Sequence, residues 1–310
     1  MRYLVPSYYF RFRCIADKCR HSCCIGWDVA VDSDTVSTLS ESSALSAREL
    51  CTHFYRDGDT CYVGMCDGGR CPMLDGGGLC RLITECGEGA LPLICKRHPR
   101  FILLLGDRVA VGLGIACEEA CRTVLLHKEP FELVEYADLP REWGDIPYSG
   151  DGVPYGTEYL SAAISKIESA KTLADANVAL RAHFGVPDIS RTADGWIDLI
   201  SEFEMLDPSW QKTLAGSAAG GRKDFAEREL ILKNLLKYFV FRYLPEAEDV
   251  RDLGVTLNLA IVLADVADRL FDKNGIADAA GALDVCRALS SEIEYSEENM
   301  CDIRFEIEMA

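Results

Sequence analysis

The cysteines of this chain are concentrated in one part of the sequence, and their side chains have the chemistry of soft-metal ligands. The chain has 310 residues and 15 cysteines, of which 13 lie within the first 121 positions. The series begins with Cys14, Cys19, Cys23 and Cys24. Thiolates are the preferred protein ligands of zinc and of iron–sulfur clusters. The distribution therefore predicts a metal-binding module rather than a general richness in cysteine.

Several features favour reduced cysteines over disulfides. The first residues include arginines and Pro6 before any uninterrupted apolar stretch of signal-peptide length, so we expect no secretion signal and a cytoplasmic protein. Thiols stay reduced in that compartment. A chain of this length can also bury an ample core without a dense disulfide framework. The odd number of cysteines fits complete pairing poorly.

The spacing of the cysteines bears on which metal they bind. No C-x2-C pair occurs, although zinc ribbons and thioredoxin-like redox sites use that spacing. The chain has C-x4-C-x3-C-C at Cys14–Cys24, and later Cys71-x8-Cys80 and Cys86-x8-Cys95. Iron–sulfur clusters accept varied spacing, because their irons lie apart and their ligands are mostly cysteines. The sequence favours an iron–sulfur cluster, with zinc as the alternative.

Several segments together resemble the flagellin lysine N-methylase family, and more broadly the zinc- or iron-chelating cysteine-cluster proteins. The cysteine segments of this likeness are Phe12–Trp27, Cys71–Cys80, Cys95–Arg100 and Cys117–Ala120. Two later segments continue it, Leu232–Tyr243 and Glu292–Asn299. The cysteine segments are the specific part of the resemblance.

The resemblance implies methyl transfer from S-adenosylmethionine to lysine side-chain amines of flagellin, by an enzyme that carries an iron–sulfur cluster of the 4Fe-4S type. Matched by position, the implied metal ligands are Cys14, Cys19, Cys23, Cys24, Cys71, Cys80, Cys95 and Cys117. No role is assigned to Cys51, Cys61, Cys66, Cys86 or Cys121. The chain departs from ordinary radical S-adenosylmethionine enzymes, since it lacks their C-x3-C-x2-C motif. The alternative is a non-catalytic protein that chelates zinc or iron.

Basic residues next to Cys95 are the candidates for binding the methyl donor. Lys96, Arg97 and Arg100 could contact the carboxylate of S-adenosylmethionine. Trp27 could stack on its adenine. The alternatives are a solvated basic patch and a tryptophan that is part of the core.

Methylation also requires an uncharged lysine nucleophile. A lysine ammonium with a pKa of about 10.4 has no lone pair, so a base or a dry pocket is needed. His21 and His98 are the candidate catalytic bases. The alternative for each is a histidine that only hydrogen-bonds to the backbone.

The hydrophobic pattern divides the chain into three parts. Residues 1–125 read as an irregular cysteine-rich module with minor β structure, including a hairpin of 101–105 and 109–111 across Gly106 and Asp107. Within it, Cys117 and Cys121 are predicted to share one face of a short helix. Residues 126–156, rich in proline and glycine, read as a linker. Residues 157–310 show apolar stripes with helical periodicity and predict an α-helical bundle. The predicted stripes cover 160–173, 232–243, 257–271 and 280–293. The predicted fold is thus mainly α.

Charge is distributed unevenly between the two halves. Residues 1–121 have 13 basic and 15 acidic residues, whereas the remainder has 19 basic and 35 acidic residues. Nucleic acid is an unfavourable partner for such a surface, and no apolar stretch is long enough to span a membrane. An acidic face would attract a protein substrate with exposed lysines, although a surface that only confers solubility is an equally simple explanation.

Overall fold

The computed structural model describes the chain except for residues 1, 42–44, 106–107, 137–154 and 219. Two compact units are present. The first, called the helical unit, comprises Met1–Phe12, Ile102–Tyr136 and Ser149–Ala310. The second, called the cysteine module, comprises Arg13–Phe101 together with Ala137–Tyr148. Helix predominates over strand, which confirms the prediction of a mainly α chain with a helical C-terminal part.

This division differs from the predicted one. The predicted boundary lay at residue 125, but Ile102–Tyr136 and the first twelve residues belong to the helical unit. The reason is strand pairing, because β1 (Arg2–Pro6) pairs in parallel with β6 (Arg108–Leu113). Parallel neighbours need a long crossover connection, and here the cysteine module lies within that connection. Most of the predicted linker, residues 137–154, lies outside the described residues.

The sheet of the helical unit has four strands in the order β5-β6-β1-β7. β5 is Arg100–Leu105 and β7 is Leu133–Tyr136, which pairs antiparallel with β1. The predicted hairpin strands are therefore β5 and β6, adjacent in the sheet, while the turn at 106–107 lies outside the described residues. β6 is buried along nearly its whole length, as expected of an inner strand covered on both faces.

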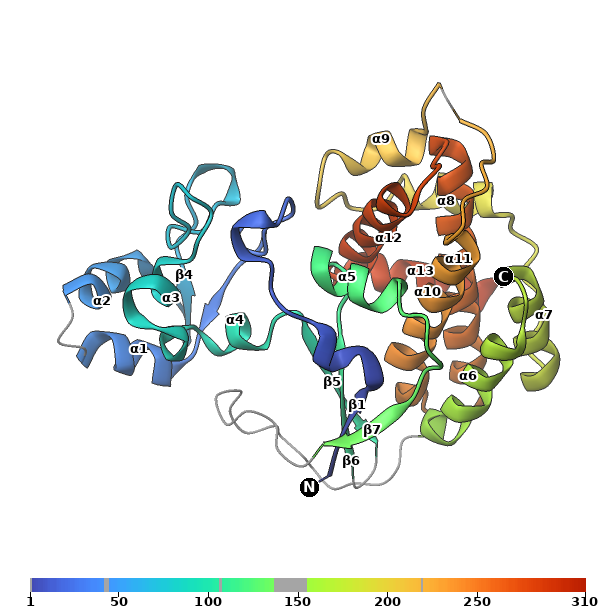
Figure 1. The fold of residues 1–310 in the computed structure, drawn as a ribbon, viewed down its shortest axis with the longest axis horizontal. Helices are drawn as coiled ribbons and strands as arrows, with labels where there is room; N and C mark the ends of the chain where they lie inside the picture. Colours follow the sequence, from blue (N-terminus) through green and yellow to red (C-terminus); the bar gives the residue numbers. More distant parts are fainter. Residues whose placement is uncertain (1, 42–44, 106–107, 137–154, 219) are drawn as a thin grey trace. The chain divides into compact units, whose positions relative to one another are not determined.

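Figure 1 shows the helices that follow in the chain. Two of them begin and end at residues with known capping preferences. Thr172 forms a capping box with Asp175 at the start of α7, and Gly185 ends this helix in the left-handed conformation. Asp249 caps the 25-residue α11, which Gly275 ends in the same way. The helices of this unit are α5 (Glu118–Leu125), α6 (Leu160–Ser169), α7 (Leu173–Phe184), α8 (Ala193–Ile200), α9 (Trp210–Ala215), α10 (Arg228–Tyr243), α11 (Val250–Asn274), α12 (Ala279–Glu294) and α13 (Glu297–Met309).

The predicted stripes correspond to helices with one correction. α10, α11 and α12 contain the three later stripes, and Pro245 lies just past the end of α10 as predicted. The stripe predicted over 160–173 is two helices, because the backbone becomes extended at Ala170 and α7 begins afresh at Leu173. α11 is buried on almost all sides, packed against α8, α10, α12 and α13, so it is the central helix of the unit. Across the described part of the chain, no helix combines the length and apolarity needed to cross a membrane.

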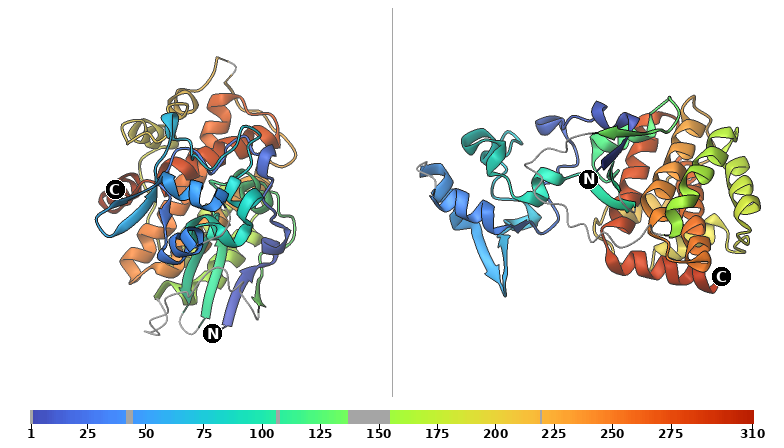
Figure 2. Two further views of the ribbon diagram at one scale, coloured as in Figure 1. Left: turned by 90° about the vertical axis from the view of Figure 1, so that its left-hand side faces the viewer. Right: turned by 90° about the horizontal axis from the view of Figure 1, so that it is seen from below.

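The cysteine module consists of short elements joined by turns. Its three-stranded sheet has the order β2-β4-β3, and β3 (Phe54–Asp57) and β4 (Thr60–Val63) form a hairpin that projects from the module (Figure 2). Its short helices are α1 (Ser33–Glu41), α2 (Leu45–Leu50), α3 (Arg81–Cys86) and α4 (Leu93–Arg97), and its remaining strand is β2 (Ala30–Val31). A small apolar core includes Leu39, Leu50, Val63, Met73 and Leu82.

Candidate functional site

Four cysteines of the module gather in one place. Cys24, Cys71, Cys80 and Cys95 are close enough that every pair among them interacts electrostatically. We call them the four-cysteine group. All four are among the eight ligands that the resemblance implied, and they come from segments up to 71 positions apart in the sequence.

Backbone hydrogen bonds position three of these cysteines. The Cys71 N–H donates to the carbonyl of Cys24 at 2.8 Å, which joins the first cysteine segment to the second. Leu74 and Cys80 form an antiparallel bridge, and the Arg81 N–H donates to the Met73 carbonyl at 2.7 Å. Cys95 belongs to α4, which packs near β2. The group is thus built by turns and bridges rather than by one long element.

Asp75 shapes the loop between Cys71 and Cys80. Its Oδ1 accepts hydrogen bonds from the N–H groups of Gly77 and Leu79, each at 2.8 Å. This is an Asx-type turn, in which an aspartate replaces backbone partners. Gly78 has φ +84°, a conformation that glycine adopts without strain. Asp75 therefore has a structural role in bringing Cys80 towards Cys71.

Arg70 stabilises the same loop from the other side and was missed by the sequence reasoning. Its guanidinium donates to the carbonyls of Leu74 and Asp75, at 3.1 and 2.6 Å. Its positive charge also helps to lower the pKa of Cys24. The only sequence signal was its position directly before Cys71.

The environment differs among the four thiols. A hydrogen bond from the Cys23 thiol is the largest cause that lowers the pKa of Cys24 to about 7, and Ser22 and Arg70 add to it against the effect of burial. Burial raises the pKa of Cys71 to about 11 and that of Cys95 to about 12, and it also raises the pKa of Cys80. Cys24 is therefore the thiol most readily ionised, and the other three need a nearby cation to become thiolates at neutral pH.

The four-cysteine group has thiols alone as its donors. Among the described residues, no three His, Cys, Asp or Glu side chains are grouped closely enough to hold one metal ion. The four thiols lie within electrostatic reach of one another. Their surroundings are also apolar, since Cys71 is 7% exposed and the other three pack against the small core of the module. Thiols are the donor type that both iron–sulfur clusters and zinc accept.

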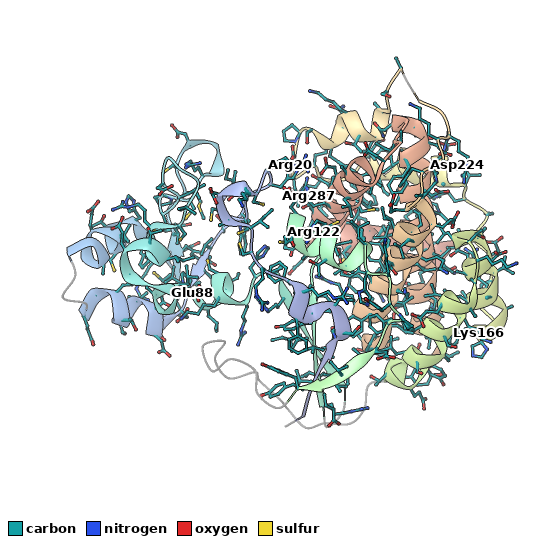
Figure 3. The ribbon with its side chains drawn as sticks, in the orientation of Figure 1. Arg20, Glu88, Arg122, Lys166, Asp224 and Arg287 are labelled. Carbon is teal, nitrogen blue, oxygen red and sulfur yellow. The ribbon has the colours of Figure 1, made fainter. Side chains whose placement is uncertain are left out.

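The remaining implied ligands of the module lie outside this group. Cys14 and Cys23 are exposed, and Cys19 is half-buried. Cys14 Sγ accepts a hydrogen bond from the Ala16 N–H at 3.4 Å. Cys66, to which no role was assigned, interacts electrostatically with Cys71 and pairs with Arg70 in an isolated bridge. Sulfur atoms, in yellow, recur across the module that carries Arg20 and Glu88 (Figure 3).

Cys117 and Cys121 belong to the helical unit instead. Cys117 is the N-cap residue of α5, and its carbonyl accepts a hydrogen bond from the Cys121 N–H at 2.8 Å, so the two cysteines lie one turn apart at the start of this helix, as predicted. Their thiols also interact electrostatically. Cys121 is 1% exposed, and its thiol donates to the carbonyl of Leu283 in α12 at 3.5 Å. Burial raises its pKa well above the usual value, and Cys286 is also nearby. Cys121 is thus a neutral core thiol that packs α5 against α12.

Two of the other predicted site residues are brought together. The rings of Trp27 and His98 have centroids 5.9 Å apart, and the Trp27 indole N–H donates to the carbonyl of Cys23. The Nε2 atom of His98 is buried without a hydrogen-bond partner in the structure. Burial, assisted by Arg100, lowers the pKa of His98 to about 4, so its ring is neutral at pH 7. Such a low pKa makes His98 a weak general base.

The other candidate site residues lie at the end of α4, at the start of β5 and in the loop before Cys23. Lys96 and Arg97 end α4, directly after Cys95, and Arg100 begins β5. All three are half-buried, and Arg100 donates to the His98 carbonyl at 3.4 Å. His21 is half-buried in the loop that precedes Cys23. The contacts of these side chains with a methyl donor or a lysine substrate remain predictions.

The helical unit contains a buried polar network that the sequence reasoning missed. The Glu294 side chain is 0% exposed and accepts hydrogen bonds from the hydroxyls of Tyr238, Tyr243 and Ser290. It also pairs with Arg242, at 3.0 Å. The two later segments of the resemblance, 232–243 and 292–299, meet in this network. The signal available was the spacing of Tyr238 and Arg242, four apart on one face of a helix.

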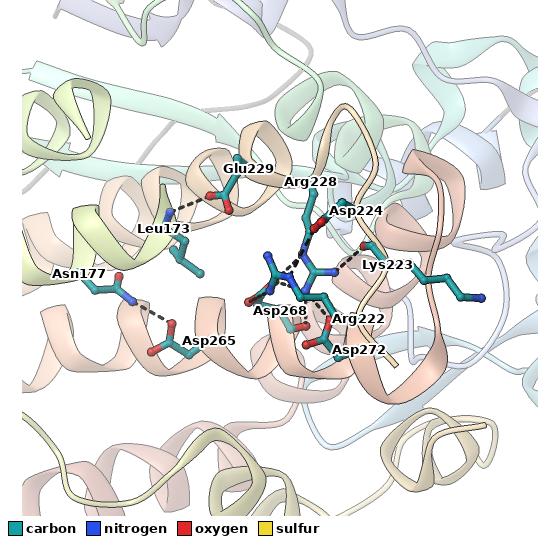
Figure 4. A network of polar contacts seen from close by, with 10 residues as sticks. All are labelled: Leu173, Asn177, Arg222, Lys223, Asp224, Arg228, Glu229, Asp265, Asp268 and Asp272. Carbon is teal, nitrogen blue, oxygen red and sulfur yellow. Dashed lines mark hydrogen bonds and ion pairs between the residues drawn. The ribbon is translucent and has the colours of Figure 1, made fainter. Parts of the chain in front are cut away.

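A second network joins α10 to α11. Arg228 is 2% exposed and pairs with Asp268 and Asp272, at 2.5 and 2.7 Å. One turn earlier on α11, Asp265 accepts a hydrogen bond from the Asn177 amide at 2.8 Å (Figure 4). Burial raises the pKa of Asp265 to about 6. These contacts stabilise the packing of the helices.

Comparison with known proteins gives three significant matches among curated sequences. A lysine-N-methylase of Salmonella typhimurium strain LT2 is 26% identical over 153 residues, which cover 46% of this chain and 37% of that protein. A lysine-N-methylase of Salmonella choleraesuis strain SC-B67 is 25% identical over the same length, with the same coverage. The flagellar biosynthetic protein FliU of Salmonella muenchen is 25% identical over 147 residues, which cover 44% of this chain and 84% of that protein.

Two further comparisons found nothing. No protein-family model matches the chain, and no solved structure matches it. The matched part of the chain spans well under half the length of the lysine-N-methylases. On the evidence of sequence, this chain is similar to the lysine-N-methylases and to FliU, which supports the resemblance seen in its cysteine segments.

Proposed function

We propose that this protein transfers a methyl group from S-adenosylmethionine to lysine side chains of a protein, with flagellin as the proposed substrate. The observation that carries the proposal is the similarity to two proteins named lysine-N-methylase. The similarity to a flagellar biosynthetic protein supports the choice of substrate.

The proposal includes an iron–sulfur cluster held by Cys24, Cys71, Cys80 and Cys95. The mutual proximity of the four thiols and their apolar surroundings support it. Bound there, a cluster would supply the positive charge that stabilises buried thiolates, and it could exchange electrons. Zinc remains the alternative metal.

The reaction itself places demands on the protein. Transfer forms a bond between the methyl carbon and the lysine nitrogen and breaks the bond from that carbon to sulfur, whose electron pair stays with sulfur. The attacking lysine must first lose a proton. We propose that Trp27 and the neutral ring of His98 form an apolar wall near Cys23, and that Lys96, Arg97 or Arg100 contacts the donor carboxylate. An apolar surface of this kind excludes water and would therefore favour the uncharged form of the substrate lysine amine.

The alternative function is a non-catalytic metal chelator. The observation that favours it is that all four residues of the four-cysteine group belong to the cysteine module, so metal binding there would need no residue of the helical unit. The use of S-adenosylmethionine and of a protein substrate distinguishes the methylase from the chelator.

The test is a methyl-transfer assay with the full chain purified without oxygen. Flagellin and S-adenosylmethionine with an isotope-labelled methyl group are added, and methyl-lysine is measured by mass spectrometry. We expect label on lysines with the unaltered chain, and at least a tenfold lower yield with Cys24→Ser. A metal-loaded chain that leaves both the donor and flagellin unchanged would support the chelator instead.

A further inference from the structure

The C-terminal helix α13 has two apolar faces, and only one is covered. Ile303 and Ile307 are buried against the rest of the unit. Cys301, Phe305 and Met309, spaced four residues apart, form a second stripe on the same helix. Phe305 is 59% and Met309 69% exposed, and Cys301 is exposed as well. We call these three residues the α13 stripe.

A groove runs beside this stripe, between α13 and the start of α11. Its volume is about 400 Å³, and its lining includes Val255, Cys301 and Phe305. All its walls belong to the helical unit. Val250, the first residue of α11, is 70% exposed. Adjacent exposed apolar side chains of this size are typical of binding surfaces.

Two ion pairs link the walls of the groove. Arg304 of α13 pairs with Asp252 of α11 at 2.5 Å, and Arg251 of α11 pairs with Glu308 of α13 at 2.6 Å. These pairs fix the width of the groove. They also neutralise both of the arginines that line it.

The rim that remains is acidic. Of the five acidic residues of α13, Glu308 belongs to one of these pairs and Glu306 pairs with Arg191, while Glu297, Glu298 and Asp302 take part in none of them. Exposed carboxylates next to the stripe include Glu298 and Asp302. A ligand with apolar side chains and positive charges would be complementary to this surface. A second copy of the same acidic face would be repelled.

We propose that this groove binds a lysine-bearing amphipathic segment of the protein substrate. The inference rests on the proposed function for the identity of the partner, and it adds a docking surface to it. An amphipathic helix that places apolar side chains on Phe305 and Met309 would direct its lysines towards the acidic rim, a common mode of peptide recognition. The substrate class is therefore a protein with lysines beside an apolar helical face.

The first experiment measures binding alone. A fluorescent amphipathic peptide of leucine and lysine, and its leucine–glutamate counterpart, are titrated with the full chain, and fluorescence anisotropy is recorded. We expect the lysine peptide to bind at least tenfold more tightly than the glutamate peptide, and more weakly as salt increases. Phe305→Ser combined with Met309→Ser should weaken binding about tenfold. Glu298→Gln combined with Asp302→Asn should weaken it less and reduce its salt dependence.

The matched control is Val178→Ser, because Val178 is 68% exposed on α7 and outside the groove. Equal affinity of all variants for the lysine peptide would overturn the proposal. Loss of self-association in the Phe305 and Met309 variant, measured by sedimentation, would assign the stripe to a second copy instead and would also overturn it.

The second experiment separates this proposal from the methylase proposal. In the methyl-transfer assay with flagellin, the double serine variant should raise KM about tenfold and leave kcat unchanged. If no variant transfers methyl groups but the lysine peptide still binds at the stripe, the methylase proposal fails and the docking surface stands. If KM is unaffected while the unaltered chain is active, the docking surface fails.

Discussion

The helical unit and the cysteine module stabilise their buried polar groups in opposite ways. In the helical unit, charged side chains are buried together with partners, as Glu294 is with Arg242 and Arg228 is with Asp268. In the module, the buried polar atoms at the candidate site are thiols, whose pKa burial raises at Cys71, Cys80 and Cys95. The helical unit therefore supplies its own counter-charges, whereas the buried thiols of the module would become thiolates only beside a cation, such as that of the proposed metal site.

The two units also differ in how their shape is determined. Long capped helices around α11 build the helical unit, and their order follows from apolar periodicity. Turns, single bridges and helices of five to nine residues build the module around a small core. A small core gives little stability of its own. Metal binding should thus be coupled to folding in the module and not in the helical unit.

The largest expected effect is that of metal removal. We expect a strong chelator under reducing conditions to raise amide hydrogen exchange in residues 13–101 by at least about tenfold, while exchange in α10 and α11 stays the same. Mass spectrometry of peptides from both units measures this directly. If chelation left amide hydrogen exchange unchanged in both units, the expected coupling of metal binding to the folding of the module would be contradicted.

Breaking the network at Glu294 should have the next largest effect. Glu294→Ala leaves Arg242 and two tyrosine hydroxyls without their shared acceptor, and we expect a loss of about 3–5 kcal/mol in the free energy of unfolding of the helical unit. Chemical denaturation followed by circular dichroism measures the loss. The control is Asp194→Ala, which breaks the exposed pair with Arg269 and should cost under about 1 kcal/mol. Similar losses of unfolding free energy in both variants would contradict the conclusion that burial makes the Glu294 network more important for stability than an exposed ion pair.

A pH-dependent effect should appear at Asp265. Its pKa is about 6 in the folded chain and near 3.8 when unfolded, so the folded state binds its proton more tightly. The contribution of Asp265 to the free energy of unfolding is therefore fully present below about pH 4 and is lost as the pH rises through about 6. In Asp265→Asn this pH-dependent loss should be absent. The change in the free energy of unfolding from pH 4 to pH 8 should therefore be about 1–2 kcal/mol more favourable in the variant than in the unaltered chain. The measurement is denaturation across that range, and an unchanged pH profile would show that Asp265 is not perturbed.

The smallest expected effect concerns a helix cap. Thr172→Ala removes the side-chain acceptor for the Asp175 N–H and should cost about 1 kcal/mol. Thr172→Ser keeps the hydroxyl and should restore most of the stability. Denaturation midpoints of the two variants give the comparison, and equal midpoints would show that the cap contributes nothing.

The helical bundle could be predicted from sequence because its signals are local. Helices α10, α11 and α12 follow from apolar periodicity, and Pro245 marks the end of the first. The pairing of β1 with β6 could not be predicted, because it joins residues about 100 positions apart and no local sequence pattern indicates which strands will pair. For that reason the boundary was expected at residue 125, and Cys117 and Cys121 were expected in the module.

The metal-binding role of the cysteines stays a prediction, and the structure adds which of them lie near one another. The resemblance named eight cysteines, and the structure brings together Cys24, Cys71, Cys80 and Cys95. Which four would meet depends on the turn at Asp75 and on the hydrogen bond between Cys71 and Cys24, which spacing alone does not reveal. Helical spacing placed Cys117 and Cys121 at the start of one helix, and the structure has Cys117 as the N-cap of α5, one turn before Cys121.

The most direct test of the account is the iron and acid-labile sulfide content of chain purified without oxygen. Four irons and four sulfides per chain are expected for the unaltered protein. Serine at any one of Cys24, Cys71, Cys80 or Cys95 should lower both severalfold, whereas Cys51→Ser, which changes a half-buried module cysteine outside the group, should not. Full iron content in all four variants, or loss caused equally by Cys51→Ser, would contradict the claim that these four sulfurs form the site.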